Sequence, residues 1–162
     1  MIVVLERSAF MNSDNPNPAK AGEPLPVVYA CSGCSDAGEI ADRVARQLTR
    51  DGAARMSCLA GIGGRVKPLM STAEKAGRIL VVDRCPLNCA RKTLELAGFD
   101  AFDHLELHDL GIRKGSAPVT EQRIACAVDA ARKILAAESS PVPPETAALD
   151  SIPALVEAAP AQ

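Results

Sequence analysis

Aromatic residues are scarce in this sequence, which has no tryptophan, one tyrosine and three phenylalanines among 162 residues. Nucleic-acid-binding proteins commonly stack bases on aromatic rings and attract phosphates with an excess of basic side chains. The chain offers neither feature, because its formal net charge is −2 at pH 7. We therefore expect no nucleic acid among its partners. The hydrophobic fraction of 48% still allows a core, which must be built from aliphatic side chains.

Long apolar runs are also missing. None approaches the roughly 18 residues that a membrane-spanning helix needs, so the sequence predicts no membrane partner. The opening run over residues 2–5 is too short for a secretion signal, and Glu6 interrupts it. We therefore expect a cytoplasmic protein. In that reducing compartment, six cysteines are more typical of metal ligands or reactive thiols than of disulfides.

The two ends of the chain are polar and lack a regular pattern of hydrophobic residues. Residues 11–26 are rich in Asn and Pro, and the chain beyond residue 137 is rich in Ala, Pro and Glu. Neither segment has helical or strand periodicity, so we predict a disordered leader over 1–25 and a disordered tail over 137–162. One folded domain over 26–136 is expected between them.

Short apolar runs alternate with amphipathic segments within this domain. Predicted strands cover 27–30, 55–60, 79–83 and 104–110, and predicted helices cover 36–50, 68–76, 89–97 and 120–136. This alternation indicates a parallel sheet with helices on both faces. With right-handed crossovers, we expect an α/β fold, a three-layer flavodoxin-like or Rossmann-like sandwich. Its sheet should have about four strands in the order 2-1-3-4.

Five of the six cysteines lie at or just beyond the ends of predicted strands: Cys31 and Cys34, Cys58, and Cys85 and Cys89. The carboxyl ends of parallel strands share one edge of the sheet. In the expected order, the first and third strands flank the point where the winding reverses, which is where such folds bind ligands. We expect these five thiols to converge there, with Cys126 far away on the last helix.

Two of these clusters also begin predicted helices. The helix dipole and free amides at a helix start lower a thiol pKa, so we expect thiolates, which soft metals prefer. The Cys31-x-x-Cys34 pair can chelate from one turn, and the spacing of Cys85 and Cys89 places their sulfurs about one helical turn apart. Four such thiolates complete a closed tetrahedral zinc site. Cys58 is a fifth candidate ligand.

Three segments together resemble the DGC-domain family of bacteria and archaea: 28–36 (VYACSGCSD), 58–64 (CLAGIGG) and 82–90 (VDRCPLNCA). That family is described as zinc-binding on account of its cysteines, so the resemblance implies Zn²⁺ as the cofactor and no established reaction. The resemblance covers nearly all of the predicted folded core. The family takes its name from an Asp-Gly-Cys tripeptide, which here reads Asp83-Arg84-Cys85. If the backbone needed a positive φ there, Arg84 would be strained.

An iron–sulfur protein is an alternative. Cys31, Cys34, Cys58 and Cys85 are similar to the cluster ligands of the hydrogenase small subunit and of a related quinone-reductase subunit, which also lie on the turns of a flavodoxin-like domain. On this hypothesis the chain transfers electrons through a 4Fe-4S cluster, and Cys89 is spare. Zinc would instead use Cys89 in place of Cys58.

Thiol chemistry is a second alternative. A strand, a Cys-x-x-Cys pair and a helix are typical of thiol-disulfide oxidoreductases, with Cys31 as the nucleophile and Cys34 as the resolving thiol. The spacing of Cys85 and Arg91 also fits a Cys-x5-Arg phosphate loop, but this segment lacks the glycines such a loop needs. His104 and His108, four residues apart on a predicted strand, are candidate auxiliary metal ligands.

The Gly61-Ile62-Gly63-Gly64 segment is expected to form a tight turn beneath the metal site. No general base or substrate pocket is identified in the sequence, so no catalytic residue is named. A structural or metal-handling role ranks above an enzyme, and a protein partner stays open.

Overall fold

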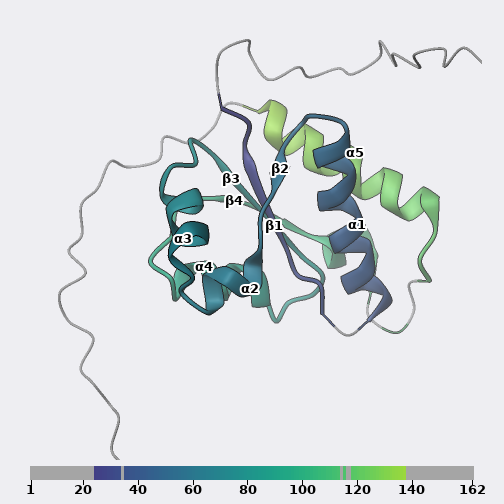
Figure 1. Ribbon diagram of the computed structural model, residues 1–162. Helices are drawn as coiled ribbons and strands as arrows, with labels where there is room; N and C mark the ends of the chain where they lie inside the picture. The colour runs from purple at the N-terminus through teal and green to yellow at the C-terminus, as the bar shows by residue number, and fades with distance from the viewer. Residues whose placement is uncertain (1–23, 34, 114, 116–117, 138–162) are drawn as a thin grey trace, which may run out of the picture.

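The computed structural model describes residues 24–33, 35–113, 115 and 118–137. They form a parallel β-sheet covered by helices on both faces (Figure 1). The predicted leader and tail fall almost wholly outside the described residues, and Cys34 falls outside them as well.

The sheet has four strands: β1 (Val27–Ala30), β2 (Arg55–Met56), β3 (Ile79–Asp83) and β4 (Asp103–Glu106). Their order is β2-β1-β3-β4 and every neighbouring pair is parallel, which confirms the predicted topology. β1 pairs with β3 so that Ala30 lies opposite Val82. The winding therefore reverses between β1 and β3, and their carboxyl ends are level.

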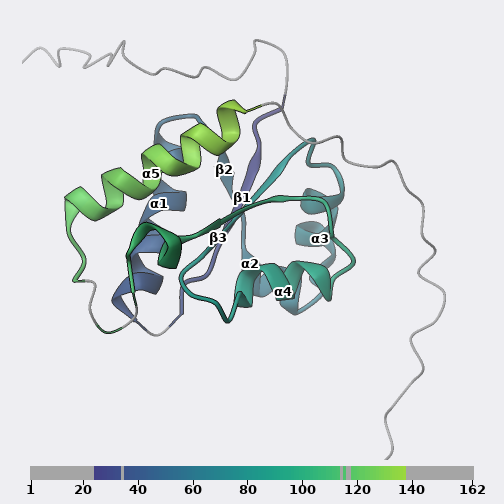
Figure 2. The ribbon, with the colours of Figure 1, turned by 180° about the vertical axis from the view of Figure 1, so that it is seen from behind.

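Five α-helices cover the two faces: α1 (Asp36–Arg50), α2 (Leu59–Gly63), α3 (Lys67–Glu74), α4 (Cys89–Glu95) and α5 (Glu121–Ala136). Helices α1 and α5 lie on one side of the sheet, and α2, α3 and α4 lie on the other (Figures 1 and 2). This arrangement confirms the three-layer sandwich.

Strand side chains alternate between the two layers, because successive residues of a strand point to opposite faces. Val28 and Val82 pack in the core shared with α1 and α5, whereas Tyr29 and Val81 pack in the core shared with α2, α3 and α4. Both faces are buried, so β3 is apolar along almost its whole length. The second core includes Cys31, which places the first cysteine on the side of α4.

The predictions for the second and fourth strands were wrong at their carboxyl ends. The second was expected to reach residue 60 but ends at Met56, and the Gly-rich segment expected as a tight turn lies in α2 and at its end. Gly61 permits this helix to pack against α3, since a Cβ there would lie 1.9 Å from Leu69 Cδ1. The fourth strand ends at Glu106, opposite the last residue of β3. Without a strand to pair with, the chain continues as the 3-10 helix η1 (Leu107–Leu110).

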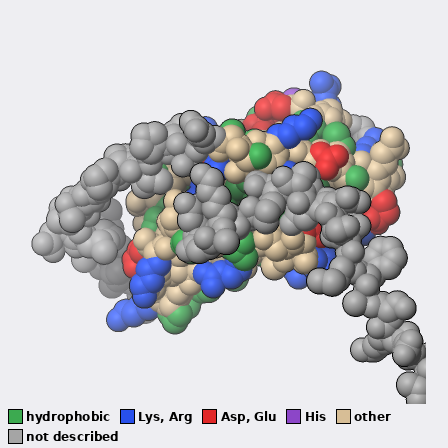
Figure 3. Space-filling model, turned by 90° about the horizontal axis from the view of Figure 1, so that it is seen from above, with side chains coloured by type: hydrophobic (Ala, Val, Ile, Leu, Met, Phe, Trp, Pro, Cys, Tyr) green, Lys and Arg blue, Asp and Glu red, His purple; other side chains and the backbone are tan. Residues whose placement is uncertain are grey.

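None of the helices in the described part of the chain is both long and apolar enough to cross a membrane. On the described surface seen from above, basic and acidic side chains are both present (Figure 3). This mixture agrees with the small net charge of the sequence.

The start of α1 packs tightly on the loop that follows β1. A Cβ built on Gly38 would lie only 2.4 Å from the backbone oxygen of Gly33. The Ser35 hydroxyl caps the helix by accepting a hydrogen bond of 3.3 Å from Gly38 N. Gly38 thus allows α1 to hold the loop that begins at Cys31.

Gly38→Ala should therefore destabilise the fold by about 1–3 kcal/mol, the usual cost of overpacking a tight contact. The sign of this change in the free energy of unfolding is informative, because alanine ordinarily stabilises a helix by about 1 kcal/mol relative to glycine. Urea denaturation followed by circular dichroism measures the difference. Gly63→Ala in α2 is the matched control, since its Cβ would meet Thr93 Cγ2 at an ordinary 3.6 Å. Equal losses in both variants would contradict the close approach of α1 to the loop.

Candidate metal centre

Two cysteines lie at the ends of the central strands. Cys31 follows β1 directly, and Cys85 comes two residues after β3. Cys31 N donates to Val82 O at 2.9 Å, so the pairing of the two strands continues one residue beyond β1. Both side chains are buried, with 5% and 9% of their surfaces exposed. Strand pairing therefore fixes two thiols at the carboxyl edge of adjacent strands.

Cys89 belongs to the same region, although it is solvent-exposed on the first turn of α4. Its pKa is raised, first by partial burial of the thiol and then by the negative charges of Cys31, Asp83 and Cys85. Arg84 acts in the opposite direction and lowers it. Because Cys31 and Cys85 both act on it, both of these thiols lie within electrostatic reach of Cys89.

The raised pKa of Cys89 contradicts the expectation that a helix start would favour its thiolate. Partial burial of the thiol is the first cause, and the negative charges of Cys31 and Asp83 follow. Asp83, only 1% exposed, accepts hydrogen bonds of 2.9 Å from Ala90 N and from Arg91 N. Its carboxylate therefore takes the stabilisation that the helix start would give to a thiolate, and it fixes the turn that carries Cys89.

The remaining predicted cysteines have different settings. Cys58 is exposed at the start of α2, where it lines a groove of about 840 Å³ along β2. It is not among the groups that shift the pKa of Cys89. Cys126 is exposed on α5, across the sheet from α4. The fifth predicted ligand, Cys34, lies outside the described residues.

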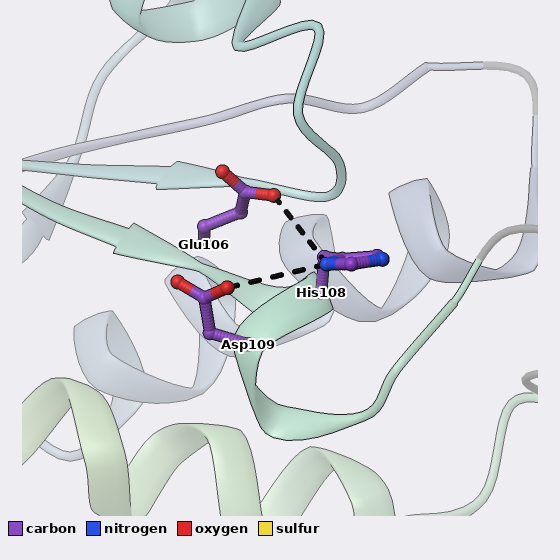
Figure 4. A group of neighbouring side chains, drawn as sticks. All are labelled: Glu106, His108 and Asp109. Carbon is purple, nitrogen blue, oxygen red and sulfur yellow. Dashed lines mark ion pairs between the residues drawn. The ribbon is translucent and has the colours of Figure 1, made fainter.

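A mixed group of potential ligands lies beyond β4. His108 Nδ1 is 3.9 Å from Glu106 Oε1 and 4.0 Å from Asp109 Oδ1 (Figure 4). Among the described residues, these three side chains form the one group of His, Cys, Asp and Glu whose ligand atoms all lie within 4.8 Å of one another. No three of the described cysteine sulfurs all lie within 4.8 Å of one another.

The two histidines singled out in the sequence do not share a strand face. His104 lies on β4, and its Nε2 is 3.2 Å from Asp83 Oδ2. His108 lies on η1, because the strand ends earlier than predicted. His104 therefore supports the carboxylate that holds α4, whereas His108 faces Glu106 and Asp109.

The sequence profile of the DGC domain matches residues 27–131, from the start of β1 into α5. The chain belongs to the DGC-domain family. It is 42% identical over 92 residues to a protein of Pseudomonas aeruginosa named anaerobic and virulence modulator AnvM, an alignment that covers 57% of this chain and 70% of that protein. No solved structure matches significantly.

The tripeptide that names the DGC family carries arginine at its centre in this chain, and the structure shows how this residue is accommodated. Among the described residues other than glycine, only Arg65 and Asn88 have positive φ, so Arg84 is not strained. Its side chain is 6% exposed and crosses the loop after β1, with Nε 3.2 Å from the position of a Cβ on Gly33. Arg84 Nη1 donates to Ser35 Oγ at 2.6 Å.

Arg84 thus connects the loop after β3, which carries Cys85, with the loop after β1, which carries Cys31. This link was not foreseen from the sequence, which indicated only a cation beside the thiols. The sequence did mark this position as unusual, because arginine replaces the glycine of the family tripeptide. The contact with Ser35 could not be predicted, because it depends on how the two loops pack.

In metal-free protein, Cys89 should react with iodoacetamide at higher pH than a cysteine in an unstructured peptide. A raised pKa leaves less thiolate at any given pH below it, and the thiolate is the reactive form. Cys31→Ser should move the profile of Cys89 towards lower pH, because the thiolate of Cys31 is the strongest of the neighbouring charges that raise it. Mass spectrometry of the alkylated peptide at a series of pH values measures both profiles. A profile for Cys89 at or below that of the peptide would contradict the electrostatic coupling.

Proposed function

We propose that this chain binds zinc through the thiolates of Cys31, Cys34, Cys85 and Cys89. The observation that carries the proposal is the coupling of three thiols at the reversal point of the sheet, where Cys31 and Cys85 are buried and both raise the pKa of Cys89. Neighbouring thiolates repel one another, and a soft divalent cation relieves that repulsion. Cys34 is included in the proposed ligand set only because of the Cys-x-x-Cys spacing and the family resemblance.

The chemistry of the donor set fits zinc, a divalent cation without redox chemistry that accepts four thiolates in tetrahedral geometry. Asp83 would hold the turn of Cys89 through the amides of α4. Arg84 would offset the excess negative charge of a four-thiolate site, in addition to joining the two loops through Ser35. Zinc binding would draw the three described sulfurs closer together than they are in this structure.

A metal-handling or regulatory role is favoured over catalysis. A site closed by four thiolates leaves no position for the water that hydrolytic zinc requires. The relative in Pseudomonas aeruginosa is named a modulator, which supports a regulatory role for this chain as well. All five cysteines within the described residues are free thiols, in keeping with the reducing cytoplasm in which we expect the protein to act.

The geometry favours zinc over the two alternatives. A 4Fe-4S cluster would use Cys31, Cys34, Cys58 and Cys85. It would leave out Cys89, although the pKa of Cys89 responds to Cys31 and Cys85. It would also require Cys58 as a ligand, although Cys58 lines a groove. Thiol-disulfide exchange with protein substrates would need an accessible nucleophile, whereas Cys31 is 5% exposed.

Cys89→Ser should reduce the zinc content of protein purified without oxygen from about one ion per chain to well below one. Cys58→Ser should leave the zinc content unchanged, because Cys58 is not in the proposed ligand set. Elemental analysis together with an absorption spectrum measures the result, and Cys126→Ser serves as the matched control for loss of an exposed thiol. The reverse pattern, with metal lost in Cys58→Ser, retained in Cys89→Ser and present as iron, would contradict the proposal.

Removal of zinc by a moderate chelator should leave the chain folded, if the protein handles metal rather than depending on it for stability. The reason is that apolar side chains from elements on both faces of the sheet form two hydrophobic cores, to which the described proposed ligands contribute only Cys31. Circular dichroism during titration with the chelator measures the fold while a colorimetric indicator measures the released zinc. Unfolding in step with zinc release would contradict metal handling and assign the ion a structural role.

A further inference from the structure

The outer side of β2 opens into a groove of about 840 Å³. Helix α1 borders it through Arg46 and Arg50, and Leu59 and Leu69 of α2 and α3 border it on the other side. This volume falls within the range of sites that bind small molecules, which is about 300–1,000 Å³. Addition of an extended peptide strand is disfavoured, because Met56 N already donates to Thr49 Oγ1 at 2.9 Å.

The groove is positively charged in a protein whose net charge is negative. Three arginines line it, Arg46, Arg50 and Arg55, against one carboxylate among the described lining residues, that of Asp42. Asp42 is already engaged by Arg46, with contacts of 2.6 and 3.3 Å. Arg50 is held by the neutral amide oxygen of Gln47 at 2.6 Å, so its charge is not cancelled. The groove therefore attracts a small ligand that carries negative charge.

An exposed thiol lies just beyond the carboxyl end of β2. Cys58 lines the groove beside Ser57.

We propose that the groove binds acidic disulfides of low molecular weight and that Cys58 is modified by them to a mixed disulfide. The observations that carry this are the excess of guanidinium groups, the volume of the groove and the exposed thiol within it. The inference is independent of the proposed zinc site, whose ligand set does not include Cys58.

The step is a thiol–disulfide exchange. Cys58 gives its proton to water, and its Sγ attacks one sulfur of the bound disulfide. A new S–S bond forms to Cys58 while the original S–S bond breaks, and the second half leaves as a thiolate with the electron pair and then takes up a proton. Cys58 is oxidised and the departing thiol is reduced, so no further oxidant is needed.

The test compares three disulfides of different charge on the full chain with its metal: glutathione disulfide, which is acidic, bis(2-hydroxyethyl) disulfide, which is neutral, and cystamine, which is basic. Peptide mapping by mass spectrometry gives the rate at Cys58 and, as an internal reference, at the exposed Cys126. At low ionic strength we expect Cys58 to react about tenfold faster with the acidic disulfide than with the basic one, relative to Cys126, and added salt should reduce the difference.

Charge reversal in the groove should invert this preference. Arg50→Glu combined with Arg55→Glu should make Cys58 prefer cystamine, and the milder pair Arg50→Gln and Arg55→Gln should abolish the preference. Arg113→Glu combined with Lys133→Glu is the matched control, because it changes the net charge equally at exposed positions away from the groove. Equal charge dependence at Cys58 and Cys126, or a preference unaltered by the groove variants, would overturn the proposal.

Discussion

The parallel pairing of β1 with β3 is the constraint on which the candidate centre depends. In this register Ala30 lies opposite Val82, and the hydrogen bond from Cys31 N to Val82 O extends the strand pairing to the first cysteine. A slip of one residue would send every side chain of β1 to the other face. Cys31 would then leave the core it shares with α4 and join the layer of α1 and α5. The burial of both faces of the sheet makes such a slip costly, so the register that builds the core also aligns the thiols.

A buried carboxylate and a buried guanidinium then organise the loops around these thiols. Burying either charge is costly unless hydrogen bonds compensate it. Asp83 is compensated by two amides of α4 and by His104, and Arg84 donates to Ser35. Each charged group therefore joins elements that are distant in the chain: Asp83 joins β3 to α4 and β4, and Arg84 joins the loop after β3 to the start of α1. The same two residues act on Cys89 in opposite directions, the carboxylate raising its pKa and the guanidinium lowering it.

The strands and helices with strong local signals could be predicted from the sequence. The bounds of β1, α1 and β3 agree with the prediction, because continuous apolar runs and four-residue repeats identify buried strands and an amphipathic helix. Helix α2 could not be predicted, since its glycines favour a turn unless the packing of Gly61 against Leu69 is known. The end of β4 depends on where its partner β3 stops, which is a property of the sheet rather than of the segment.

The candidate site, like the fold, could be predicted from the sequence only in part. The order of strands was sufficient to place Cys31 and Cys85 at one edge, but the raised pKa of Cys89 depends on the partial burial of its thiol and on the charges of Cys31 and Asp83 around it. The groove at Cys58 is formed by arginines from α1 and β2 that have no shared motif in the sequence. Contacts between segments that are distant in the chain determine the groove and the pKa of Cys89. The spacing of residues along one segment gives no information about those contacts.

The most direct test of the central claim is X-ray absorption at the metal edge of the full chain, purified without oxygen. Four sulfur ligands around zinc at about 2.3 Å are the result that a site of four cysteine thiolates predicts. Zinc surrounded mainly by nitrogen and oxygen ligands, or iron in place of zinc, would contradict it.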